Sequence, residues 1–356
     1  MAGAYDTQLT ELIETTLKQG ASDLHLNTGY HPTIRVNGLL LPLVTKNELT
    51  DADTRGLMEI LLSPENKETF LREKEIDFSY SYNNDTVRFR GNCSFARGFV
   101  AIALRLIPKQ IRTIEELNLP SVLADFARRQ QGFFLVVGPV GHGKSTTLAA
   151  MIDVVNSERP DHIVTIEDPI EYIFEPKKSM INQREVRIDT IDFHKALNQL
   201  FRQDVDVVMI GEMRGPETIA TAVTAAETGH LVLSTLHTNN ASQTIDRIID
   251  SFQPESQAQV RVQLAGSLLG IFSQRLIQKV SGGMVPAYEL LINTKAVANL
   301  IREARTHEID SVIETGSDYG MVDMNRSLAE LVRRGDITVE DARMHSLNPT
   351  ILEKLL

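Results

Sequence analysis

The chain has 356 residues, of which 42% are hydrophobic and 23% are charged, and these ordinary values argue against a disordered or fibrous protein. Acidic residues outnumber basic ones by 47 to 36, and the formal charge of −11 argues against a protein that mainly coats nucleic acid. The single cysteine, Cys93, excludes an internal disulfide and a zinc site built from cysteines, and it fits a reducing, cytoplasmic setting.

The N-terminal segment carries neither the basic nor the apolar stretch of a signal peptide. No apolar run in the chain approaches the roughly 18 residues that span a membrane. We therefore expect any membrane link to go through a partner, without direct insertion. Leu9, Leu12, Ile13 and Leu17 recur at helical spacing and predict an amphipathic helix that ends near Gly20.

The stretch that follows consists of short alternating runs broken by Gly, Asn and Asp. In the last of these runs, Val100, Ile102 and Leu104 share one face. Such alternation is typical of an antiparallel sheet with one solvated face. Helical patterns over residues 51–62 and 64–73 accompany the strands. This combination predicts an α+β domain.

Regular patterning is lost between Pro108 and Pro120, which indicates a domain boundary. We therefore predict a smaller domain over residues 1–107, a linker over 108–120 and a larger domain over 121–356. The chain length suits two domains, and one large domain is the alternative.

The larger domain begins with continuous apolar runs that alternate with helical stripes. Because strands of this kind are buried on both faces, the alternation predicts a parallel α/β sheet. From about residue 294 the pattern is helical only. The apolar runs predicted as strands are 133–137, 163–166, 205–210 and 231–233.

The run from Gly138 to Ser145 matches the phosphate-binding pattern G-x-x-x-x-G-K-[ST], between a predicted strand and a predicted helix. In that setting backbone N–H groups and a helix N-terminus converge on phosphates. We expect Lys144 to contact the β- and γ-phosphates and Ser145 to bind Mg²⁺. A glycine-rich turn with a surface lysine is the alternative. The predicted nucleotide-binding residues are Gly138, Pro139, Val140, Gly141, His142, Gly143, Lys144, Ser145 and Thr146.

Carboxylates follow two of the predicted strands, at the edge where α/β proteins bind ligands. Glu167, Asp168 and Glu171 follow the second strand, which Pro169 ends, and one of these acids could orient an attacking water. Glu212 follows the third strand, where P-loop NTPases hold their metal shell. We expect Glu212 to reach Mg²⁺ directly or through a water. Solvated surface carboxylates are the alternative for both groups.

Two histidines, His230 and His237, stand at the two ends of the fourth predicted strand. We expect His237 to lie in the cleft beside the γ-phosphate. A structural role is equally compatible with His230. No Cys or acid lies at ligand spacing, so a zinc site is not indicated.

Arginines on the predicted strands of the smaller domain allow two interpretations. They either keep a solvated sheet face soluble, or one or two of them reach the γ-phosphate of a neighbouring subunit as arginine fingers. Arg202 and Arg247 in the larger domain carry the same ambiguity. The arginines in the smaller domain are Arg88, Arg90, Arg97 and Arg105.

Several boxes in this order resemble those of the type IV pilus and type II secretion ATPases, with the greatest likeness to the pilus retraction branch. The likeness runs essentially from end to end. It implies an α/β fold class: a RecA-like P-loop NTPase core with a smaller PAS-like α+β N-terminal domain. The segments that carry it are Ala21–Leu26, Arg35–Gly38, Gly138–Thr147, Thr165–Glu171, Gly211–Arg214, Thr224–His230 and Leu236–Thr238.

The resemblance also implies an assembly and a task. The family forms cytoplasmic hexameric rings at the inner face of the cytoplasmic membrane, and nucleotide binds between the two domains. ATP and Mg²⁺ are the implied cofactors, and an inner-membrane pilus platform protein is the implied partner. The implied function is a motor that couples ATP hydrolysis to pilus retraction and twitching motility.

Family roles carry over onto matching positions. The resemblance implies that Glu171 is the water-activating glutamate, with Glu167 as the alternative, and that Glu212 is the Walker B glutamate. The remaining matches are His230 and His237 to the histidine box, Arg90 and Arg105 to the inter-subunit arginines, and Arg97 to the same arginine set.

Two features bear on the branch of the family. Extension and secretion ATPases usually carry an extra N-terminal domain and a four-cysteine insertion, so a chain with Cys93 alone favours retraction. A helical motif of the retraction branch reads Ala-Ile-Arg-Asn-Leu-Ile-Arg-Glu. The matching segment of this chain has Ala298 in place of the first arginine, and this difference counts against retraction. The phosphate loop has His142 where the family commonly has serine.

Three alternatives remain open from the sequence alone. A pilus extension or type II secretion ATPase is the nearest. A RecA-type nucleic-acid translocase is more distant, because the chain is acidic and lacks a basic stripe. A regulatory nucleotide-binding subunit without turnover is the third.

Overall fold

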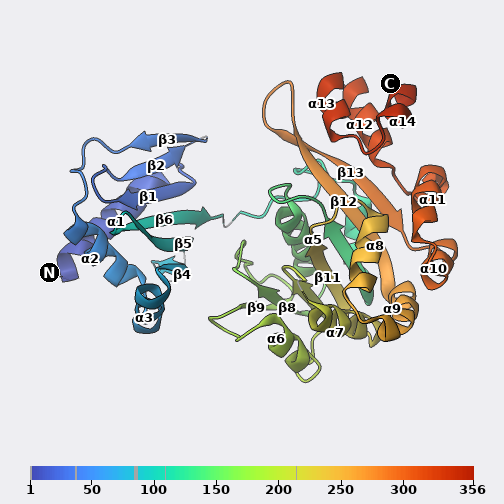
Figure 1. The fold of residues 1–356 in the computed structure, drawn as a ribbon, viewed down its shortest axis with the longest axis horizontal. Helices are drawn as coiled ribbons and strands as arrows, with labels where there is room; N and C mark the ends of the chain where they lie inside the picture. Colours follow the sequence, from blue (N-terminus) through green and yellow to red (C-terminus); the bar gives the residue numbers. More distant parts are fainter. Residues whose placement is uncertain (1, 37, 84–86, 109, 214) are drawn as a thin grey trace. The chain divides into compact units, whose positions relative to one another are not determined.

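The computed structural model describes residues 2–36, 38–83, 87–108, 110–213 and 215–356. Asn37 and Arg214, which belong to two of the family-like segments, lie outside the described residues. The chain divides into two compact units, residues 1–109 and 110–356 (Figure 1). No helix in the described ranges combines the length and apolar character that crossing a bilayer requires.

Within the described residues, the first unit contains a six-stranded antiparallel sheet and three helices, as the alternating and helical patterns predict. Its strand order is β3-β2-β1-β6-β5-β4. The likeness to PAS domains stays a prediction. The elements are α1 (Ala2–Lys18), β1 (Asp23–Asn27), β2 (Thr33–Val36), β3 (Leu39–Pro42), α2 (Asp51–Leu61), α3 (Pro64–Glu73), β4 (Glu75–Tyr82), β5 (Val87–Ala96) and β6 (Phe99–Ile107).

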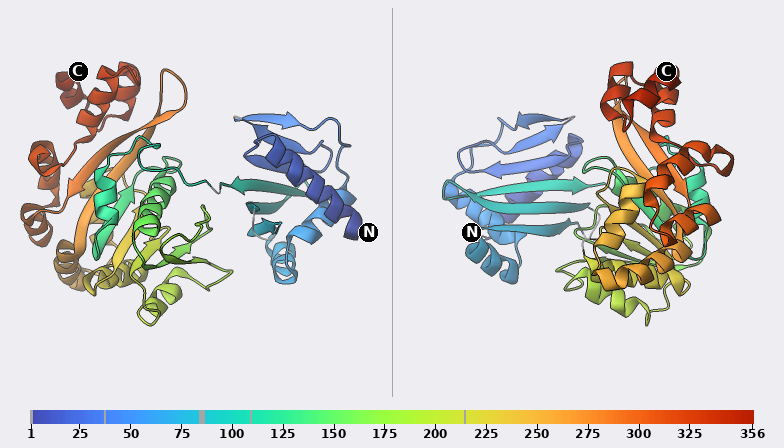
Figure 2. Two further views of the ribbon diagram at one scale, coloured as in Figure 1. Left: turned by 180° about the vertical axis from the view of Figure 1, so that it is seen from behind. Right: turned by 45° about the vertical axis from the view of Figure 1, so that its right-hand side comes forward.

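The core of this unit lies on one face of the sheet, where α1 runs across the strands (Figure 2, left). Val100, Ile102 and Leu104 of β6 are buried there, while Arg105 is exposed on the other face. The start of α2 is set by a capping box, in which the Thr50 side chain accepts the N–H of Asp53 and the Asp53 carboxylate accepts the N–H of Thr50.

The second unit contains a seven-stranded sheet in the order β13-β12-β7-β11-β10-β8-β9. All of its pairings are parallel except that of β12 with β13. The four strands predicted from apolar runs are confirmed. The strands are β7 (Gly132–Val137), β8 (His162–Glu167), β9 (Met180–Glu185), β10 (Val207–Ile210), β11 (Leu231–Leu236), β12 (Leu268–Gln278) and β13 (Met284–Ile292).

Helices cover both faces of this sheet, because successive residues of each strand point to opposite sides. In β7, Phe134 and Val136 pack toward α4 and α5, whereas Leu135 and Val137 pack toward α6 to α9. The predicted fold class, a P-loop α/β core with a smaller α+β unit, is confirmed. The helices are α4 (Val122–Ala127), α5 (Lys144–Glu158), α6 (Phe193–Leu200), α7 (Pro216–Glu227), α8 (Ala241–Asp250) and α9 (Pro254–Ser267).

The C-terminal part is helical, as predicted, and packs on the long β12–β13 hairpin. Ile277 and Val285 of the hairpin share a small core with Met324 and Leu328 of α12. Short 3₁₀ turns at Thr306–Glu308 and Ser317–Tyr319 join some of the helices, which are α10 (Lys295–Arg302), α11 (Ile309–Thr315), α12 (Met324–Arg333), α13 (Val339–His345) and α14 (Pro349–Leu355).

Two parts of the second unit differ from the sequence expectation. The strands β9, β12 and β13 were not predicted, since their sequences mix polar and apolar residues and carry no clean period. Residues of the predicted linker 108–120 belong to the second unit, where Ile114 and Leu119 are buried in the core beside α4. Apolar side chains without periodicity can still be buried when a neighbouring element covers them.

Gly91 of β5 leads to a stability prediction for the first unit. It lies opposite Phe78 of β4, and the ring of Phe78 occupies the space that a Cβ at position 91 would need. We expect Gly91→Ala to lower the free energy of unfolding of this unit by about 1–3 kcal/mol, because the ring must leave its packed position. Guanidinium titration of the full chain, followed by circular dichroism, measures the change.

Gly3→Ala is the matched control, because no atom lies within 4 Å of a Cβ built at that helical position. We expect it to leave the unfolding curve nearly unchanged. An equal effect of both substitutions would show that the Phe78 contact is not the cause.

Candidate functional site

Four predicted functional segments meet at one edge of the second sheet. The phosphate loop follows β7, Glu167 ends β8, Glu212 follows β10 and His237 follows β11. These four strands are parallel neighbours, so their carboxyl ends lie side by side. This is the edge at which open α/β sheets bind ligands.

The phosphate loop runs from Gly138 to Gly143 and leads directly into α5. Gly138 has φ +144°, and a Cβ there would collide with the backbone oxygen of Gln274 in β12, so only glycine fits. Gly143 is the N-cap of α5 and has φ +80°. The loop backbone and the open N–H groups of the first helical turn form the anion-binding arrangement that the motif predicts.

The Lys144 side chain is turned inward and only 7% exposed. Its Nζ donates to the carbonyl oxygens of Gly138 and Pro139, both at 2.9 Å, and to Nδ1 of His237 at 3.0 Å. Burial lowers the pKa of Lys144 to about 8, and the negative charge of Glu212 opposes that shift. These neutral partners of the ammonium group could be exchanged for phosphate oxygens.

His237 links the lysine to the carboxylate of Glu212. A lysine ammonium only donates, so Nδ1 of His237 must accept, and the ring proton of the neutral imidazole sits on Nε2. That nitrogen lies 3.4 Å from Oε1 of Glu212. The structure therefore brings Lys144, His237 and Glu212 together, as the sequence predicts.

The two glutamates of the acidic segment lie in different environments. Glu167 is 4% exposed and accepts from the Thr165 hydroxyl at 2.6 Å, and burial raises its pKa to about 7. Glu171 is exposed, and its backbone N–H donates to Glu167 at 3.3 Å. Of the two, Glu171 has the open position that contact with a substrate water requires.

The remaining loop residues face different surroundings. Val140 is exposed at the tip of the loop, and Ser145 is exposed in the first turn of α5. The Thr146 hydroxyl lies 2.8 Å from the hydroxyl of Tyr172, a residue that the sequence did not single out. The His142 ring is directed at β12, where Nδ1 accepts the N–H of Leu276 at 2.9 Å.

His230 does not join the phosphate site of its own subunit. It precedes β11, whereas His237 follows that strand, so the two are separated by about 20 Å of extended chain. Nδ1 of His230 lies 2.9 Å from the carbonyl oxygen of Ala225, and its ring packs edge-on against Phe201. The prediction that His230 binds nucleotide stays a prediction, and within this subunit the residue lies at the end of β11 opposite to the phosphate loop.

The predicted inter-subunit arginines belong to the first unit. Arg90 of β5 and Arg105 of β6 are cross-strand neighbours. Nε of Arg105 donates at 2.8 Å to Oδ1 of the buried Asp23, yet the Arg105 side chain remains 69% exposed. Arg97 is exposed in the turn between β5 and β6. Their predicted roles stay predictions.

A cavity of about 170 Å³ borders the loop and the first turn of α5. Apolar side chains make up much of its wall, and polar groups of Arg112, Glu116 and Asn118 also reach it. No sequence motif marks the lining residues outside the loop and α5, because they come from two segments that are distant in the chain, 112–119 and 274–286. The apolar lining residues are Leu117, Leu119, Leu276, Met284 and Pro286.

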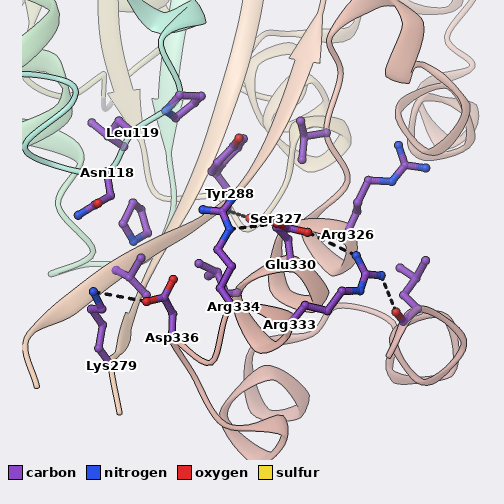
Figure 3. A pocket seen from close by; sticks show the side chains of 16 residues that line it. Asn118, Leu119, Lys279, Tyr288, Arg326, Ser327, Glu330, Arg333, Arg334 and Asp336 are labelled. Atoms are coloured by element: carbon purple, nitrogen blue, oxygen red, sulfur yellow. Dashed lines mark hydrogen bonds and ion pairs between the residues drawn. The ribbon is translucent and has the colours of Figure 1, made fainter. Parts of the chain in front are cut away.

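A second, larger cavity of about 590 Å³ lies between the β12–β13 hairpin and α12 (Figure 3). Several of its charged groups neutralise one another within the wall. Nζ of Lys279 lies 3.4 Å from Asp336, and Nε of Arg334 donates to Glu330 at 3.0 Å. Four of its lining residues are basic and two are acidic, and it shares Asn118, Leu119 and Pro286 with the smaller cavity.

A phosphate loop between a buried strand and a helix, with a carboxylate and a histidine after neighbouring parallel strands, defines a P-loop nucleoside triphosphatase. The family model described as "Type II/IV secretion system protein" matches residues 3–283. The chain belongs to this family.

Individual relatives show which members of this family the chain is similar to. The type IV pilus retractation ATPase PilT of Pseudomonas aeruginosa is 44% identical over 94% of this chain and 97% of its own. A twitching motility protein of Neisseria gonorrhoeae is 44% identical over 89% of this chain and 84% of its own. A crystal structure of the pilus retraction motor PilT with bound ADP superposes with a TM-score of 0.90 at 45% identity, over 97% of this chain and 98% of that one.

The burial of Glu167 leads to a prediction about how the stability of the fold depends on pH. Its pKa of about 7 in the folded chain lies above the ordinary value of 4.5, so the native state holds a proton that the unfolded state has lost. This carboxyl therefore destabilises the fold as the pH rises from 5 to 8, by roughly 2–3 kcal/mol. We expect Glu167→Gln to show a smaller fall in thermal midpoint over that range, measured by differential scanning fluorimetry.

Glu314→Gln, at an exposed position of α11, is the control and should keep the wild-type pH dependence. Parallel pH curves for wild type and Glu167→Gln would refute the assignment of a raised pKa to this carboxyl.

Proposed function

We propose that this protein is the ATP-hydrolysing motor of type IV pilus retraction. The observation that carries the proposal is the meeting of Lys144, His237 and Glu212 beside a complete phosphate loop. This site lies in a chain that is 44% identical to the PilT ATPase of Pseudomonas aeruginosa. The protein uses nucleotide, hydrolyses ATP and thereby drives pilus disassembly and twitching motility.

The substrate is held by two features of the second unit. The phosphates lie against the N–H groups of the loop and the N-terminus of α5, where Lys144 exchanges the carbonyl oxygens of Gly138 and Pro139 for phosphate oxygens. The nucleoside enters the adjacent cavity of about 170 Å³, whose apolar side chains cover an aromatic base.

Magnesium fits the donor set of the site. Ser145 offers a hydroxyl and Glu212 a carboxylate, and oxygen ligands of this kind, together with phosphate oxygens, are the ones that Mg²⁺ prefers. The ion, when bound, neutralises charge on the β- and γ-phosphates. Glu212 contributes directly or through a water.

Hydrolysis needs a group that orients the attacking water, and Glu171 takes this role. It is exposed and four residues beyond Glu167, whose raised pKa and buried hydrogen bonds suit a structural part. His237 keeps Lys144 and Glu212 connected through its two ring nitrogens. In this arrangement the negative charge of the γ-phosphate can be compensated by Lys144 and by the Mg²⁺ ion that Glu212 would hold.

The active assembly is a homohexameric ring. Arg90 and Arg105, with Arg97 nearby in the chain, act on the γ-phosphate of a neighbouring subunit. ATP binding closes the first unit of one subunit on the second unit of the next, and hydrolysis followed by product release reopens it. Sequential closure turns an inner-membrane pilus platform protein, so the ring works in the cytoplasm at the inner face of the membrane.

Removing the lysine or the Walker B glutamate tests the site. We expect purified Lys144→Ala to lose phosphate binding, because it removes the cation that contacts the phosphates. We expect Glu212→Ala to retain binding but lose turnover by at least about 10²-fold, because it removes a carboxylate that would hold Mg²⁺. A coupled ATPase assay and ADP titration measure the two effects.

The control is His307→Ala, a substitution of an exposed histidine in the C-terminal part, which should keep the wild-type rate. In cells of the source organism, deletion should give abundant surface pili without twitching, and Lys144→Ala should fail to restore motility. Wild-type turnover in either site variant would overturn the site, and a deletion strain without pili would point to extension.

Mixing subunits tests whether the arginines act in trans. Arg105→Ala alone should lower the ATPase rate by roughly 10³–10⁵-fold, as expected for an arginine finger. Mixed with Lys144→Ala subunits, it should regain part of the activity, because some interfaces then combine an intact Lys144 with an intact Arg105.

Arg72→Ala, in the exposed pair with Glu73 of α3, is the matched control and should not change the rate. Full activity of Arg105→Ala, or mixed rings that stay as inactive as the two separate variants, would count against a role in trans.

A further inference from the structure

The phosphate loop is fastened to β12 by side chains on both partners. Gln274 of β12 accepts the Thr147 hydroxyl at 2.6 Å and donates from Nε2 to the carbonyl oxygen of His142 at 2.8 Å. One residue pair further along, the N–H of Leu276 donates to Nδ1 of His142 at 2.9 Å. The loop is thus held at His142, and the first turn of α5 is held at Thr147.

The bond from Leu276 fixes the chemical form of His142. A backbone N–H only donates, so Nδ1 must carry a lone pair and the ring proton of the neutral imidazole lies on Nε2. Protonation of Nδ1 would remove the acceptor and leave two donors facing each other. The contact therefore exists only while His142 is neutral.

The groups around His142 keep it neutral. His345 at the end of α13 has its ring centroid 6.4 Å away, Arg275 of β12 lies beside it, and Lys144 follows it in the loop. Burial lowers the pKa of His142, and these three basic groups lower it further. Asp341, the acid near His345, acts on His345.

The same neighbourhood joins the loop to the C-terminal helices. Nη1 of Arg275 donates to the carbonyl oxygen of His345 at 2.8 Å, so α13 is tied to the strand that also holds the loop. The ring of His345 lies edge-on to that of the half-buried His142, with the ring centroids 6.4 Å apart. A change in the docking of α13 would move the His345 ring away from His142.

We propose that His142 is a positioning residue for ATP hydrolysis: its neutral ring accepts the Leu276 N–H and so holds the phosphate loop in the conformation that binds nucleotide. This role rests on the proposed ATPase function. His345 of α13 lies beside the contact, so that loop geometry depends on the C-terminal helices being docked. An unfastened loop binds nucleotide only in the fraction of molecules that adopt the bound conformation.

Four full-length variants test the proposal by titration with N-methylanthraniloyl-ADP and by steady-state ATPase assays. His142→Ala leaves the Leu276 N–H without its acceptor, so Kd for the ADP probe and KM for ATP should rise roughly 5–20-fold, with kcat changed far less. His142→Asn places an amide oxygen where Nδ1 lies and should restore most of the affinity. His142→Gln places its polar atoms one bond further out and should behave like His142→Ala.

The pH profile supplies a readout that a merely structural role would not move. Wild-type affinity for the ADP probe should weaken below about pH 6.5 relative to His142→Asn, which does not titrate. Loss of charge on Lys144, whose pKa is about 8, should weaken binding at alkaline pH equally in both proteins. In the fourth variant, His345→Ala, the pKa of His142 rises because one basic neighbour is gone. Its acid loss of affinity should therefore begin at a higher pH than in wild type.

The outcomes separate this inference from the proposed function. Wild-type protein that binds the probe without ATP turnover would refute the proposed function, while the ratios among the His142 variants would still decide the role of the loop contact. Equal affinity of wild type and His142→Ala, or equal affinity of His142→Asn and His142→Gln, would overturn the positioning role. If His142→Ala fails to fold, the comparison of the Asn and Gln variants decides.

Discussion

The hydrogen bonds of the buried Lys144 ammonium group are the interaction on which the rest of the site depends. A charge removed from water must be hydrogen-bonded, and here the acceptors are two loop carbonyls and Nδ1 of His237. These acceptors are neutral, and the negative charge of Glu212 lies one residue further away, beyond the imidazole. The lysine ammonium is therefore hydrogen-bonded by neutral groups, and its positive charge remains able to attract phosphate.

This arrangement depends on the sheet behind it. Parallel pairing of β7, β11, β10 and β8 brings the loop, the histidine and the two carboxylates to one edge, although they are far apart in the chain. On the other side of β7, β12 presses against Gly138 and fastens the loop. The hairpin of β12 and β13 also carries α12, so the loop and the C-terminal helices share one support.

Burial places chemically identical side chains in different environments. Glu167 and Glu171 are four residues apart, yet one is enclosed with a raised pKa and the other is open to solvent. The histidines divide in the same way, since His237 faces Glu212 and His230 is held by Ala225 at the opposite end of β11. In both pairs the position relative to the end of a strand decides which group is exposed at the carboxyl edge of the sheet.

The sequence by itself determined the elements whose signal is local. The apolar runs of β7, β8, β10 and β11 predicted buried parallel strands, and the loop from Gly138 to Ser145 predicted the phosphate site because its spacing encodes one local geometry. Only the tertiary structure decided what each side chain meets. The bonds from Lys144 to His237 and from Leu276 to His142 join residues 93 and 134 positions apart. Such pairings follow from strand order and from the irregular strand β12, and neither leaves a periodic trace in the amino-acid sequence.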